Sequence, residues 1–152
     1  MNNRQTGWLF VATQFVLLAT LVVLPTGTDW PLPPGLTIVG IALVIVGLVV
    51  VGLAASHLGE SLTATPEPKS DASLRTGGLY RFARHPIYSG VLLVVVGLAV
   101  RSRSFAALAV GVVTVVFFNG KAAWEERRLA AIYPGYAEYA GTTPRFVPRP
   151  HR

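Results

Sequence analysis

Long runs without charge alternate with short polar stretches along the chain, which is the pattern of helices that cross a membrane. Asp, Glu, Lys and Arg are absent from four such runs: Gln5 to Thr28, Trp30 to Gly59, Pro86 to Val100 and Ser104 to Gly120. A helix rises ~1.5 Å per residue, so about 20 apolar residues cross the hydrocarbon of a bilayer. We therefore predict four transmembrane helices, the last two of them short, over about 8–24, 36–56, 86–100 and 104–120.

Composition supports a membrane protein, because 52% of the residues are hydrophobic and only 13% are charged. Arg4 before the first run is also typical of a signal peptide, but the apolar run is long and no A-x-A-like site follows, so we expect a retained helix. The chain has no cysteine, which excludes disulfides, thiolate catalysis and cysteine-ligated metals. We expect no metal. We also expect no nucleic-acid partner, because the basic residues that give the net charge of +6 lie beside the predicted spans.

The basic residues predict the orientation of these spans. With both termini in the cytoplasm, eleven of the thirteen lysines and arginines lie inside, and Arg101 and Arg103 lie outside. This bias favours an N-in, C-in topology. We therefore expect a multi-pass protein of the bacterial inner or plasma membrane, with its active site facing the cytoplasm.

The fold class that follows is all-α and integral to the membrane, in one domain over 1–152. A cytoplasmic loop is predicted at 57–85 and a cytoplasmic C-terminal segment at 121–152, whose helical extension of the fourth span ends near Pro134. Six glycines are interpreted as sites of close helix packing, at positions 40, 47, 52, 90, 97 and 111. His57 and His151 belong to no motif.

Two polar clusters are expected to converge at the cytoplasmic end of the third and fourth helices. A short turn makes those helices antiparallel, so "YRFARHPIY" lies beside "KAAWEERR". Pro86 suits a first helical turn, whose free N–H groups favour an anionic group. Tyr80 and Tyr88 offer stacking surfaces, and a glutamate can hold an ammonium group. A zwitterionic ligand with an aromatic part matches this predicted pocket.

The motif "GGLYRFARHPIYSG", followed by "EERRL", "YPGYAEY" and "PRFVP", resembles the isoprenylcysteine carboxyl methyltransferase family, which includes phospholipid and thiol methyltransferase relatives. The resemblance covers Leu62 to Pro148. It implies methyl transfer from S-adenosylmethionine at the cytoplasmic membrane face. It also implies that the cofactor is bound by residues in the two clusters and the loop before them: Leu74, Tyr80, His85, Pro86, Ile87, Tyr88 and Glu125.

The chain departs from the resembled family at two positions. Members that methylate a prenylcysteine carboxylate have an arginine where this chain has Lys121, which lacks the planar fork of a guanidinium. They also have a histidine where this chain has Ala72. We expect Lys121 to bind the substrate, and Arg84 and Glu126 to orient the acceptor as catalytic residues.

The acceptor stays open at this point. A lipophilic acceptor such as an isoprenylcysteine-like carboxylate is our first hypothesis, and the bilayer is an expected partner. Two alternatives are a phospholipid N-methyltransferase and a small-thiol S-methyltransferase. A third is a non-enzymatic membrane subunit, which the small size and the glycine-rich helices favour.

Overall fold

A computed structural model describes residues 3–59 and 74–147, and every regular element within these ranges is helical. The elements are five α-helices and one 3-10 helix, in the order α1 (Asn3–Val23), α2 (Pro34–Leu58), η2 (Gly78–Arg81), α3 (Pro86–Ser102), α4 (Phe105–Ile132) and α5 (Tyr136–Thr142). The all-α fold class predicted from the sequence is therefore confirmed. Part of the predicted loop 57–85, including Ala72, lies outside the described residues.

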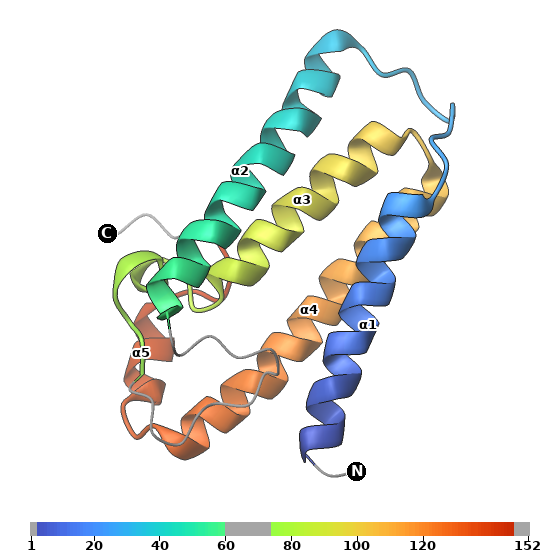
Figure 1. The fold of residues 1–152 in the computed structure, drawn as a ribbon. Helices are drawn as coiled ribbons and strands as arrows, with labels where there is room; N and C mark the ends of the chain where they lie inside the picture. Colours follow the sequence, from blue (N-terminus) through green and yellow to red (C-terminus); the bar gives the residue numbers. More distant parts are fainter. Residues whose placement is uncertain (1–2, 60–73, 148–152) are drawn as a thin grey trace.

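Four long helices run up and down along one axis, so the ends of segments distant in sequence meet (Figure 1). The end of α2, the start of α3, the later part of α4 and α5 gather at the lower end of the view, where α1 begins. Three of the helices, α1, α2 and α4, are long and apolar enough to cross a membrane. The apolar α3 has 17 residues and is shorter.

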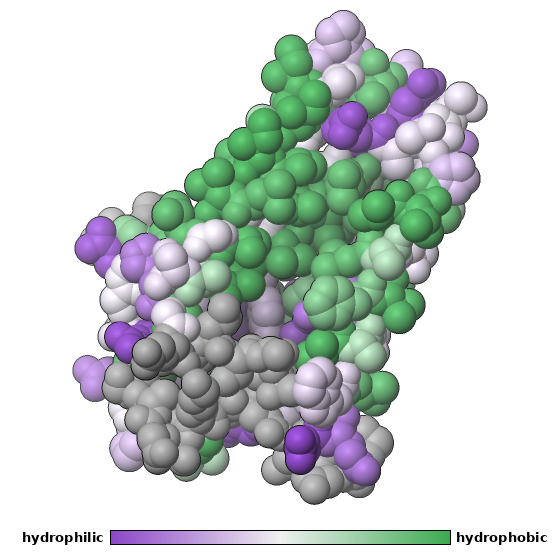
Figure 2. Space-filling view, viewed as in Figure 1, coloured by the Kyte–Doolittle hydropathy of each residue, from purple (hydrophilic) through white to green (hydrophobic). Residues whose placement is uncertain are grey.

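The apolar side chains form a continuous band along the helices, and hydrophilic residues gather towards the two ends (Figure 2). Large apolar residues such as Phe15, Ile38 and Val116 are more than 60% exposed. In water, so much exposed apolar surface would be energetically unfavourable. This is the surface of a protein whose solvent is lipid. The chain is accordingly a membrane protein, and its predicted N-in, C-in orientation stays a prediction.

Pairs of glycines bring α2 and α3 into very close contact. Gly40 lies opposite Gly97, and Gly47 lies opposite Gly90. A Cβ atom on Gly47 would lie 2.5 Å from the Gly90 carbonyl oxygen, closer than side chains tolerate. Four of the six glycines interpreted as packing sites thus have that role. Gly52 does not, because a Cβ atom there would meet nothing within 4 Å.

At the end of the bundle where α3 ends and α4 begins, two loops form hydrogen bonds with each other. The N–H groups of Gly27 and Asp29 donate to the carbonyls of Ser102 and Arg103, at 2.7 and 3.0 Å. The Asp29 carboxylate accepts from the N–H of Phe105 at 2.6 Å, which satisfies a donor in the first turn of α4. These bonds join the α1–α2 connection to the turn between α3 and α4.

Candidate functional site

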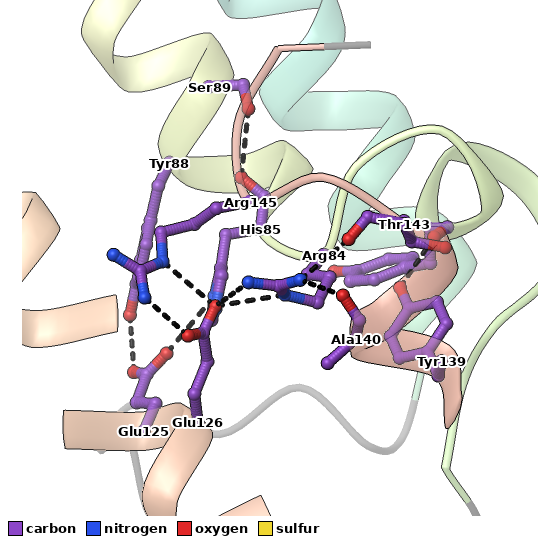
Figure 3. Close-up of polar contacts among 11 residues, drawn as sticks. Arg84, His85, Tyr88, Ser89, Glu125, Glu126, Tyr139, Ala140, Thr143 and Arg145 are labelled. Carbon is purple, nitrogen blue, oxygen red and sulfur yellow. Dashed lines mark hydrogen bonds and ion pairs between the residues drawn. The ribbon is translucent and has the colours of Figure 1, made fainter. Parts of the chain in front are cut away.

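The candidate site lies where the start of α3 meets the later part of α4 and the segment after α5 (Figure 3). Pro86 is the first residue of α3, where its missing N–H costs no helical hydrogen bond. His85 precedes it and makes no side-chain cap. The amides of Ile87 and Tyr88 in the first turn bond to no backbone acceptor within the described ranges. Such amides and the helix dipole favour an anionic group.

His85 lies between the two neighbouring glutamates of α4. Its Nδ1 is 3.5 Å from Glu125 Oε2, and its Nε2 is 3.3 Å from Glu126 Oε1. The residue is 8% exposed, so these contacts are shielded from solvent. A single imidazole therefore links the two carboxylates to the start of α3.

Glu125 has a partner on α3 besides His85. The Tyr88 hydroxyl donates a short hydrogen bond to Glu125 Oε1. The Tyr88 ring stacks parallel to the His85 ring, with centroids 5.3 Å apart. In the part of the chain that the structure describes, no arginine pairs with Glu125; its neighbours are His85, Tyr88 and the nearby Lys121.

Glu126 is held by arginines instead. Arg84 Nε and Nη2 donate to Oε1 at 3.0 and 2.9 Å, while Arg145 donates to Oε1 and Oε2 at 3.0 and 2.6 Å. Forked contacts of this kind are among the strongest ion pairs in proteins. The two adjacent glutamates thus have different surroundings, one paired with two arginines and the other with a tyrosine and a histidine.

Lys121 lies inside the helix bundle and is 3% exposed. Its ammonium group donates to Gln14 Oε1 of α1 at 2.5 Å and lies over the Tyr88 ring at 5.0 Å and the Phe118 ring at 5.8 Å. Aromatic faces stabilise a cation but accept no strong hydrogen bond. An ammonium has three donors, so two of its N–H groups can serve a ligand.

Tyr80 lies near the cluster but outside the apolar spans. Burial, followed by the neighbouring Tyr139 phenol and the Glu125 carboxylate, raises the pKa of Tyr80 to about 12. Tyr80 therefore keeps its proton at neutral pH and remains a hydrogen-bond donor. Its carbonyl accepts from the Tyr139 hydroxyl at 2.5 Å.

The structure brings together most of the residues expected from the sequence. Five of them make direct contacts within one cluster: Arg84, His85, Tyr88, Glu125 and Glu126. Lys121 lies at the edge of this cluster, over the face of the Tyr88 ring. Pro86 and Ile87 lie in the adjoining turn. Leu74 is half-buried, and within the described residues no hydrogen bond or ion pair joins it to the cluster. Within the described ranges, no group of three or more His, Asp or Glu is arranged to hold a metal ion.

Sequence reasoning missed two residues that belong to this site, Arg145 and Gln14. Arg145 stands in the quoted "PRFVP" motif, but nothing local indicated its partner on α4. Gln14 could have been noticed in the sequence, because it is a polar residue inside an apolar run. His57 also has a structural neighbour, because its ring packs against Gly78, which has a positive φ of 60°.

Tyr136 offers a test of the polar surroundings of this cluster. Its hydroxyl is buried, and within the described residues it has no hydrogen-bond partner. An unsatisfied buried polar group costs roughly 1–3 kcal/mol. We expect Tyr136→Phe to unfold at the same temperature as the wild type or a higher one, measured by thermal unfolding in detergent. A clear loss of stability would mean that this hydroxyl has a partner in the working protein, and Tyr139→Phe, which breaks the bond to Tyr80, is the destabilising control.

Two comparisons with known proteins bear on the family of the chain. Over 82 residues the chain is 37% identical to the cobalt-zinc-cadmium resistance protein CzcN of Cupriavidus metallidurans, a match that covers 53% of this chain and 38% of that protein. The chain therefore spans well under half the length of this relative. The family model for phospholipid methyltransferase matches residues 36–135, which include nearly all of α2, the whole of α3 and α4, and both polar clusters. The match confirms the resemblance to membrane methyltransferases: the chain belongs to the phospholipid methyltransferase family.

Proposed function

We propose that the protein transfers the methyl group of S-adenosylmethionine to a lipophilic acceptor, at the membrane surface where His85 and Glu125 lie. One observation carries the proposal: the first turn of α3 and Glu125 offer opposite kinds of partner within one cluster. The amides of Ile87 and Tyr88, which have no backbone acceptor among the described residues, suit a carboxylate, and Glu125 suits an ammonium group. Membership of a methyltransferase family supports it independently.

The residues present fit this cofactor. Its amino acid part is a zwitterion, which needs one anionic and one cationic partner a short distance apart. Glu125 keeps no arginine within the described residues, whereas Glu126 is already paired twice. We therefore assign the ammonium group to Glu125, and the stacked rings of His85 and Tyr88 provide an aromatic surface beside it.

S-adenosylmethionine supplies a methyl group already activated by its sulfonium. The protein then needs to hold the donor and the acceptor in line and to exclude water. His85 is 8% exposed and Lys121 is 3% exposed, so the cluster provides such a shielded environment. A carboxylate or thiolate acceptor needs no base, while an amine must first lose a proton.

Lys121 supports an acceptor that carries an anionic group. Its buried ammonium lies near the Glu125 carboxylate and contacts one amide oxygen and two aromatic faces, so a carboxylate or phosphate of the acceptor could occupy its remaining N–H donors. An isoprenylcysteine-like carboxylate fits this requirement. A phospholipid amine fits it too, because its headgroup also carries a phosphate, and the family name favours that alternative.

We place this site on the cytoplasmic side of the membrane. Arg4, Arg81 and Arg127 lie at the same end of the helices, and Arg101 and Arg103 at the other. The excess of basic residues at the site end matches the rule that cytoplasmic segments are richer in Lys and Arg.

The test is a methyl-transfer assay with product identification. The purified protein in lipid nanodiscs receives S-adenosylmethionine with a labelled methyl group and a bacterial lipid extract. We expect label in a lipid-soluble product. Mild base releases labelled methanol from an ester but not from a methylated amine or a thioether, which separates the acceptor classes. The proposal is refuted if the protein does not bind the cofactor by calorimetry and transfers no label.

A further inference from the structure

A stretch of backbone that begins within α5 and continues past its end crosses the start of α3. We call residues 139–146 the C-terminal strap. Its backbone carbonyls accept hydrogen bonds from the segment around His85, as the close-up shows in part (Figure 3). The bonds run from Arg84 N–H to Pro144 at 2.9 Å, from His85 N–H to Arg145 at 3.0 Å, and from Ser89 Oγ to Phe146 at 2.7 Å.

These bonds satisfy groups that the helix itself leaves free. A helix cannot pair the N–H groups that precede its first turn, and a buried N–H without a partner is costly. Arg84 also uses Nη1 to hold the strap, donating to the carbonyls of Ala140 and Thr143, both at 2.7 Å. The strap is therefore bonded to the segment that carries His85 and fixes the position of that residue.

One side chain of the strap reaches into the polar cluster. Arg145 forks onto both oxygens of Glu126, whose side chain is 14% exposed. Arg84 approaches the same carboxylate from the start of α3 and is 13% exposed. Glu126 thus joins α4, the start of α3 and the strap through one ion-pair network. Its four contacts to Oε1 and one to Oε2 leave it little capacity for a substrate.

We infer that Arg145 is a positioning residue of the methyltransferase site. Arg145 holds the Glu126 carboxylate beside the two arginines. The His85 imidazole therefore stays oriented towards Glu125, and Glu125 is the one of the two glutamates that is open to the cofactor's ammonium group. Arg84 and Glu126 then position the site, which is a different role from the acceptor orientation that the sequence suggested. This inference rests on the proposed function. The strap lies beyond residues 36–135, so family membership does not by itself supply it.

The experiment compares Arg145→Ala and Arg145→Lys with Arg127→Ala in the full-length protein. Arg127 is exposed on α4 beside Glu126 and is the matched loss of one arginine. Three quantities are measured: the affinity for S-adenosylmethionine by calorimetry, KM for the cofactor against kcat, and amide hydrogen exchange over residues 80–89 without ligand.

We expect Arg145→Ala to lower the affinity about tenfold or more and to raise KM more than it lowers kcat, since a charge-assisted contact is lost. Exchange over 80–89 should become faster. Arg145→Lys should recover only part of the affinity, because an ammonium cannot reproduce the fork. Arg127→Ala should match the wild type. If Arg145→Ala does not fold, Glu126→Gln decides, because it keeps the shape and removes the charge that Arg145 holds.

Three outcomes separate the two hypotheses. A wild type that binds the cofactor, together with an Arg145→Ala that binds it equally well, overturns the inference and leaves the proposed function standing. A wild type that does not bind refutes the proposed function, and the inference fails with it, even if the exchange data show that the strap is in place. Faster exchange with unchanged affinity means that Arg145 only stabilises the strap, which also contradicts the inference.

Discussion

Glu125→Gln is expected to reduce the affinity for S-adenosylmethionine by roughly one to two orders of magnitude while the protein remains folded. The amide keeps the size of the side chain and can still accept the hydrogen bond from the Tyr88 hydroxyl. What it loses is the negative charge, which in our proposal holds the cofactor's ammonium group. The measurement is calorimetric titration in detergent, together with the unfolding temperature.

Glu138→Gln is the control for this variant. Glu138 lies in the first turn of α5, is exposed, and joins no ion pair with the cluster. It should bind the cofactor as the wild type does. Equal affinity in the Glu125 variant would remove Glu125 from the cofactor site, whatever the activity of the protein proves to be.

The second large effect is expected on stability. In Gly47→Val the new side chain would meet the Gly90 carbonyl oxygen, Val94 Cγ2 and the Val94 amide, starting from a Cβ contact of 2.5 Å. Two of these atoms belong to the backbone, so a rotamer change cannot relieve the overlap and α2 must move away from α3. We expect a loss of about 3 kcal/mol, which lowers the unfolding temperature by roughly 10 °C.

Gly52→Val isolates the cause of that loss. It makes the same substitution on the same helix, five residues further on, where a Cβ atom meets nothing within 4 Å. Both variants have the backbone effect of replacing glycine, but only Gly47→Val has the steric overlap with α3. We therefore expect Gly52→Val to unfold within a few degrees of the wild type. Equal losses in both variants would show that helix propensity, and not the α2–α3 contact, decides the stability.

The parts of the fold that depend on local chemistry could be predicted from the sequence. Charge-free runs marked the long helices, and each predicted span matches an observed helix, with the first span ending and the last span beginning one residue outside it. Pro86 marked the first turn of α3, and Pro134 the region where α4 stops, at Ile132. A short turn between α3 and α4 was enough to bring the two polar clusters together. These features follow from hydropathy, from proline geometry and from chain connectivity.

The pairing of the side chains could not be predicted in the same way. Glu125 and Glu126 are neighbours in sequence, and only the rotation of α4 against α3 and the path of the strap decide which of them meets Arg145. The same holds for Gly47 and Gly52, which look alike in sequence but lie on different faces of α2. Gln14 and Lys121 are 107 residues apart, and their contact depends on how α1 leans against α4.

In the function that we propose, the glycine contacts between α2 and α3 also limit how a lipophilic acceptor can reach the site. Backbones that nearly touch at Gly40–Gly97 and at Gly47–Gly90 leave no room between them for an acyl or prenyl chain. A hydrocarbon tail that leads an acceptor to the start of α3 therefore has to travel along another side of that helix. Lys121 and Gln14 belong to α4 and α1, away from the closed seam. The contact that holds two helices together would thus also be a barrier to the lipophilic acceptor that we propose, and it leaves open the side of the bundle that carries the buried ammonium.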